Sequence, residues 1–191
     1  MTDNTGANGE PVYRAPSEPL TMQSLFDQSI LGLEKQNYHG AYITANGLSP
    51  CVFRDNNEQG CAIGVVLSDR EIEILTEVKM LRSSFNDVAI RLKLNDPVKW
   101  DAVPTPGAMD TVTELFNASS FMRLATELQN MHDVELKDGN VKKWFENMLK
   151  CCIKYDLSPA TLKMAFDKWC SSKATDQDGR VFYTIYLDKY V

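Results

Sequence analysis

Two cysteines and one histidine are the residues of this chain with the most reactive chemistry. Cys51 and Cys61 bracket a polar loop in the stretch CVFRDNNEQGCAIGVVLSD, and His132 is followed directly by Asp133. A thiolate beside an imidazole base is the pair of a cysteine-dependent hydrolase or transferase. Two thiolates and an imidazole are also ligands that Zn²⁺ accepts. The sequence therefore suggests two candidate sites. One is a catalytic pair of Cys61 and His132, and the other is a structural zinc at Cys51, Cys61 and His132.

The catalytic pair lacks an evident orienting group for its base. Such a base is usually held by a third group. Adjacent helix residues diverge by about 100°, so we expect Asp133 to point away from His132. His132 also lies at the margin of an apolar helical stripe, where a packed, hydrogen-bonded histidine is the commoner outcome. The sequence leans away from an enzyme and predicts no catalytic residue.

The spacing of the cysteines disfavours the zinc site. Zinc ligands usually come in pairs roughly two to four residues apart, whereas nine residues separate Cys51 from Cys61. Cys151 and Cys152 are adjacent and point apart on a helix. The chain also has no glycine-rich phosphate loop, GxSxG elbow or dinucleotide fingerprint. We predict no cofactor and no metal, and the zinc stays as an alternative.

Composition and charge restrict the kinds of partner that we expect for this chain. The 191 residues carry a formal net charge of −6, and 43% of them are hydrophobic, which is typical of a soluble globular protein. Clustered Lys and Arg, on which phosphate-backbone binding relies, are missing, so nucleic acid is not the expected partner. No window approaches the roughly 20 apolar residues of a membrane span. The N-terminal residues do not resemble a secretory signal, so we expect a cytoplasmic protein with free thiols.

Two parts of the chain differ in composition. Residues 1–20 are rich in Gly, Asn and Pro and hold little apolar material, which predicts a flexible arm. Tyr13 and Arg14 are the residues of this arm suited to docking on a partner. Residues 21–191 carry apolar periodicity and predict a single globular domain.

The expected fold is α+β and mainly helical, with a small antiparallel hairpin. Stripes at helical spacing predict helices at both ends of the domain, and Ser68 with Glu71 forms a capping box before a third. The segments 51–54 and 61–67 read as two strands in the register that pairs Phe53 with Cys61. That register would put both cysteines on one buried face. A further strand is predicted at the aromatic stretch RVFYTIYL near the C-terminus.

The same residues carry a resemblance. The chain resembles a group of uncharacterised small proteins encoded by bacteriophages and prophages, over residues 22–157. Such proteins carry a cysteine, an aromatic-Arg pair and CAIG before a helix, and an LQ-x-x-HD helix later. The matching positions here are Cys51, Phe53, Arg54, Cys61, Ala62, Ile63, Gly64, Leu128, Gln129, His132 and Asp133. The usual members have a proline before the helix, where this chain has Ser68. The resemblance implies a phage origin and no particular activity.

Together these observations predict a phage-encoded protein that binds another protein, either a host target or a component of the virion. Host takeover or a structural role in the particle would both fit. The expected location is the host cytoplasm or the virion, and no membrane partner is predicted. The alternatives are the cysteine-dependent enzyme using Cys61 and His132, and the protein with a zinc at Cys51, Cys61 and His132.

Overall fold

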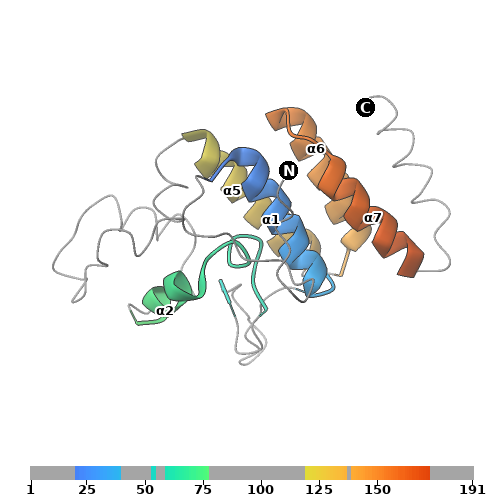
Figure 1. Ribbon diagram of the computed structural model, residues 1–191. Coiled ribbons are helices and arrows are strands. Elements are labelled where there is room, and N and C mark those ends of the chain that lie inside the picture. Colours follow the sequence, from blue (N-terminus) through green and yellow to red (C-terminus); the bar gives the residue numbers. More distant parts are fainter. Residues whose placement is uncertain (1–19, 40–52, 55–58, 78–118, 137–138, 173–191) are drawn as a thin grey trace, which may run out of the picture.

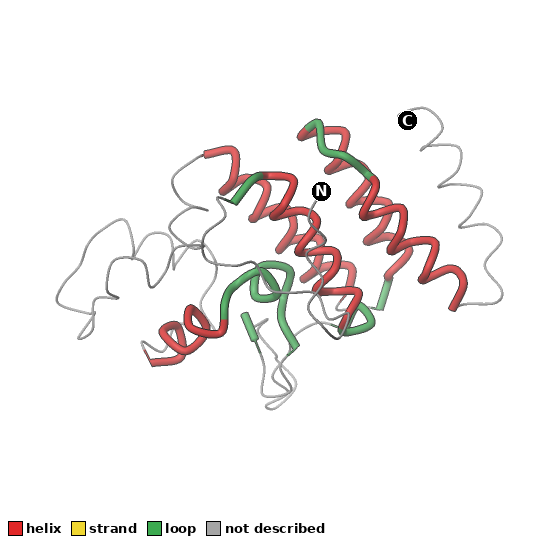
Figure 2. The backbone as a smooth tube through the Cα atoms, in the orientation of Figure 1, coloured by secondary structure: helices red, strands yellow, loops and turns green. Residues whose placement is uncertain are grey.

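The structure of the protein is a computed structural model that describes residues 20–39, 53–54, 59–77, 119–136 and 139–172. Helices dominate this part (Figures 1 and 2). The helices are α1 (Met22–Lys35), α2 (Asp69–Glu77), α5 (Ser119–Met131), the π-helix η1 (His132–Leu136), α6 (Val141–Tyr155) and α7 (Ala160–Ser172). None of those described is long and apolar enough to cross a bilayer.

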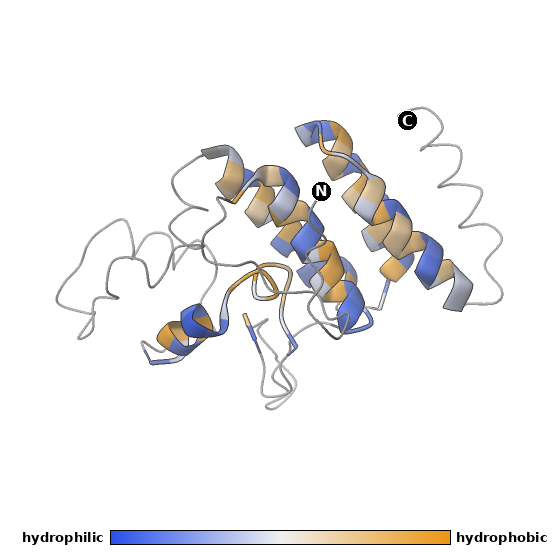
Figure 3. Cartoon of the chain, viewed as in Figure 1, coloured by the Kyte–Doolittle hydropathy of each residue, from blue (hydrophilic) through white to orange (hydrophobic). Residues whose placement is uncertain are grey.

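Four of these helices pack on one another around the core. α1 contacts both α5 and α7, and α6 contacts the same two helices. In Figure 1 the short α2 lies to one side of this group. Each packed helix carries apolar residues at helical spacing among polar ones (Figure 3), which is the pattern that the sequence predicted. The fully buried members include Leu25, Phe26, Ile30, Leu33, Leu124, Leu128, Trp144, Met148 and Leu162.

The helix starts follow local sequence signals. The predicted capping box at α2 is confirmed: the Ser68 N–H donates to Glu71 Oε2 at 2.9 Å, and the Glu71 N–H donates to Ser68 Oγ at 3.3 Å. Thr21 forms a similar box at the start of α1. Ser158 Oγ accepts the Ala160 N–H at 3.4 Å before α7. These caps satisfy donors that a helix start otherwise leaves without intrahelical partners.

The predicted α+β fold with a β-hairpin is wrong, because the described residues contain no strand. Arg54 and Gly60 form one isolated antiparallel bridge, in the expected register. After it the chain coils: the Val65 N–H donates to Cys61 O at 3.0 Å, and the Leu67 N–H to Ile63 O at 3.3 Å. We call residues 61–67 the apolar turn. All seven are buried, whereas a strand would alternate.

Gly64 makes the apolar turn possible. A Cβ atom on Gly64 would lie 1.5 Å from the carbonyl oxygen of Phe53, so only glycine permits this approach of the two backbones. The turn also packs closely on α1, where a Cβ on Gly32 would lie 2.4 Å from Val65 Cβ. Glycine therefore permits close packing at both contacts, in a turn rather than in the predicted strand.

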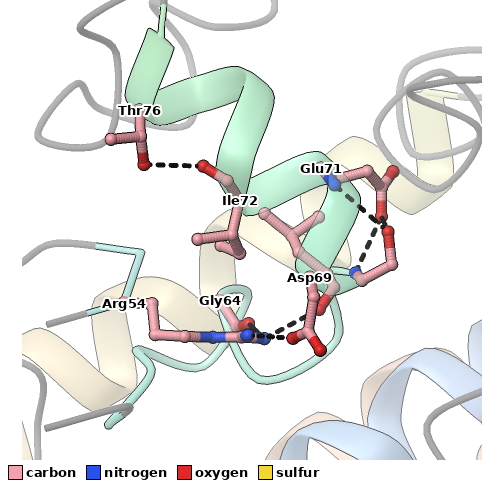
Figure 4. A network of polar contacts seen from close by, with 8 residues as sticks. Arg54, Gly64, Asp69, Glu71, Ile72 and Thr76 are labelled. Carbon is pink, nitrogen blue, oxygen red and sulfur yellow. Dashed lines mark hydrogen bonds and ion pairs between the residues drawn. The ribbon is translucent and has the colours of Figure 1, made fainter. Parts of the chain in front are cut away.

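Arg54 holds the carbonyl groups of the apolar turn. Its Nη2 donates to Leu67 O at 2.9 Å and to Gly64 O at 3.3 Å, while Nη1 pairs with the Asp69 carboxylate at the start of α2 (Figure 4). In a hairpin those carbonyls would accept from a second strand. Here one guanidinium replaces that strand and connects the turn to α2.

Several predictions concern residues that the structure does not describe. The arm at residues 1–20, with Tyr13 and Arg14, lies outside the described residues except for Leu20, and so do Cys51 and the C-terminal stretch RVFYTIYL. The boundary at residue 21 stays a prediction. After α1, Asn37 and Tyr38 have positive φ of 53° and 60°.

Substituting Gly64 tests the close approach that defines the apolar turn. Gly64→Ala should lower the free energy of unfolding by about 3 kcal/mol, because its Cβ overlaps the Phe53 carbonyl. Urea unfolding followed by circular dichroism measures the change. Gly139→Ala is the matched control: Gly139 has φ of +71° with open space around it, so only about 1 kcal/mol should be lost. Equal losses in the two variants would contradict the packing described here.

Candidate functional site

The His-Asp pair of the sequence lies in one polar network at the junction of α5 and η1. His132 Nδ1 lies 2.8 Å from Asp133 Oδ1, and Gln129 Nε2 donates to the same oxygen at 2.7 Å. A carboxylate can only accept, so the proton of this contact is on Nδ1. The His132 side chain is fully buried. The polar residues of the LQ-x-x-HD motif are therefore connected to one another.

The expectation that Asp133 would point away from His132 is wrong. It assumed α-helical geometry, but residues 132–136 form a π-helix, in which the turn is wider and neighbouring side chains separate differently. Asp133 thus supplies the orienting group that the sequence argument could not find. The imidazole that Asp133 orients is buried. A buried, hydrogen-bonded histidine is as consistent with a structural role as with a catalytic one.

Cys61 is the buried first residue of the apolar turn. Its side chain is 1% exposed, and its Sγ accepts the Gly64 N–H at 3.3 Å. Among the described residues, no three or more His, Cys, Asp or Glu side chains are grouped to hold a metal, so Cys61, His132 and Asp133 do not form such a group. Cys51, the third residue of the zinc alternative, lies outside them. The described chain thus gives neither alternative an open site.

Two further cysteines belong to the core of α6. Cys151 and Cys152 are buried, and burial raises the pKa of each thiol to about 12. The nearby Glu127 carboxylate adds to the rise in the pKa of Cys151. A thiol with such a pKa stays protonated and unreactive near neutral pH. These cysteines act as small apolar side chains.

An open groove of about 940 Å³ lies at the carboxyl end of α1. We call it the lysine groove. Three segments line it: the end of α1 and the following residues, the turn from η1 into α6, and the end of α7. Its charged and aromatic lining residues are Glu34, Lys35, Tyr38, His39, Lys142, Lys168 and Trp169. Lys168 Nζ pairs with the Glu34 carboxylate across it.

The loop after α1 shapes the wall of this groove. Tyr38 is buried and contacts the rings of Trp144 and Phe145, each with a centroid distance of 5.4 Å. Its hydroxyl donates to Ala165 O at 3.4 Å. Burial raises the pKa of the Tyr38 phenol, so it remains protonated. The loop is therefore held on both α6 and α7.

Gln36 holds the other side of the same loop. Its side-chain amide donates to Gly60 O at 2.6 Å and accepts the Gly60 N–H at 2.9 Å. A second groove, of about 760 Å³, lies on this side and is lined by Arg54, Gln59 and Asp69 among others. Lys35, Asn37 and His39 line both grooves. The loop after α1 therefore separates two open surfaces.

Sequence reasoning did not find the lysine groove. It found no cluster of Lys and Arg along the chain. His39 is exposed, and Lys35, Lys142 and Lys168 come from three separate helices. The groove arises only when α1, α6 and α7 pack, so no local pattern could have indicated it.

Comparison of this chain with protein-family models, with curated proteins and with solved structures finds no match.

Removing the Asp133 carboxylate tests the network at η1. Asp133→Ala should lower the free energy of unfolding by about 2 kcal/mol, because the buried His132 N–H loses its acceptor. Asp133→Asn keeps an acceptor oxygen and should lose less. Val134→Ala is the control, since Val134 is 62% exposed and should change stability by less than about 0.5 kcal/mol. Thermal unfolding measures all three, and an Asp133→Ala variant as stable as Val134→Ala would contradict the network.

The buried thiols should resist alkylation in the native protein. With a pKa of about 12, roughly one thiol in ten thousand is ionised at pH 8, so Cys151 and Cys152 should stay unmodified by iodoacetamide. Peptide mapping by mass spectrometry measures labelling, with the urea-unfolded protein as control. Labelling of these two at the unfolded rate would contradict the packing of α6. Fast labelling of native Cys61 below pH 8 would instead favour the cysteine-enzyme alternative.

Proposed function

We propose that the protein is a phage-encoded, non-enzymatic protein that binds another protein, either a host target or a component of the phage particle. It would act in the host cytoplasm or in the virion. The observation that carries this proposal is the contrast between the lysine groove, which is open, and Cys61 and His132, which are buried. The phage origin rests on the resemblance of two motifs alone, the one that contains CAIG and LQ-x-x-HD.

The groove has the features of a surface for recognition rather than for chemistry. Cationic side chains and a half-buried tryptophan give it both charge and apolar area. Aromatic residues are enriched at protein interfaces, and charged side chains select partners by complementary charge. No cysteine is among the described residues that line the groove. The charged and apolar side chains of the lysine groove therefore suit binding of a partner rather than catalysis.

One observation favours the enzyme alternative. His132 has a carboxylate partner at 2.8 Å, which is how a catalytic base is oriented. For this pair to act with Cys61, both side chains would have to become accessible, because each is at least 99% buried. The binding proposal needs no such opening, and for that reason we prefer it.

Affinity capture of the tagged full-length protein from infected cells, quantified by mass spectrometry, tests the proposed function. We expect a specific protein to be retained in a defined ratio to the bait, and chemical cross-links should join it to the described helices or to the arm. Tyr13→Ala with Arg14→Ala should weaken retention if the arm contributes. Recovery of the bait alone, together with turnover that is lost in Cys61→Ser, would replace the proposal with the enzyme alternative.

A further inference from the structure

We draw no further inference here: the strongest candidate, the lysine groove between the ends of α1 and α7 and the start of α6, has Lys168 already paired with Glu34, and nothing in the described part of the structure shows what covers it.

Discussion

Burial of Tyr38 sets the geometry at the carboxyl end of α1, and much of the described surface depends on it. A non-glycine residue in the left-handed region costs about 1 kcal/mol, and Asn37 and Tyr38 are both there. Burial of an aromatic side chain contributes about 2 kcal/mol or more, and the ring pairs with Trp144 and Phe145 add to it. The aromatic contacts thus outweigh the backbone cost and stop α1 where the two grooves begin.

The apolar turn is joined to this loop through backbone groups. Gln36 forms two bonds with Gly60, Gly60 pairs with Arg54, and Arg54 holds the carbonyls of Gly64 and Leu67. Each of these contacts gives a hydrogen-bond partner to a buried or half-buried backbone group. Without the contact, that group would be unpaired, as it is at the edge of a sheet. The stretch that carries the CAIG motif therefore acts as the support of α1 and α2, and the buried Cys61 packs within it.

The features that could be predicted from the sequence are those that depend on interactions between residues close together in the chain. Apolar spacing gave the faces of α1, α6 and α7, and Ser68 with Glu71 indicated the start of α2. The run from Cys61 to Leu67 could not be resolved, because seven consecutive buried residues suit a strand and a turn equally. The wider turn at His132 and the contact between Gly64 and Phe53 depend on packing. The lysine groove depends on three helices at once, so its residues gave no pattern along the chain.

The position of η1 gives the LQ-x-x-HD motif a structural consequence for the groove. Gln129, Asp133 and His132 hold the junction of α5 and η1, and Glu135 of η1 accepts from Asn147 of α6 at 3.0 Å. The Asn140 N–H then donates to Glu135 O at 2.8 Å, which places the turn before α6. Leu136, Gly139 and Lys142 of this region line the lysine groove. His132 and Asp133 thus act as positioning residues for the surface to which we assign binding.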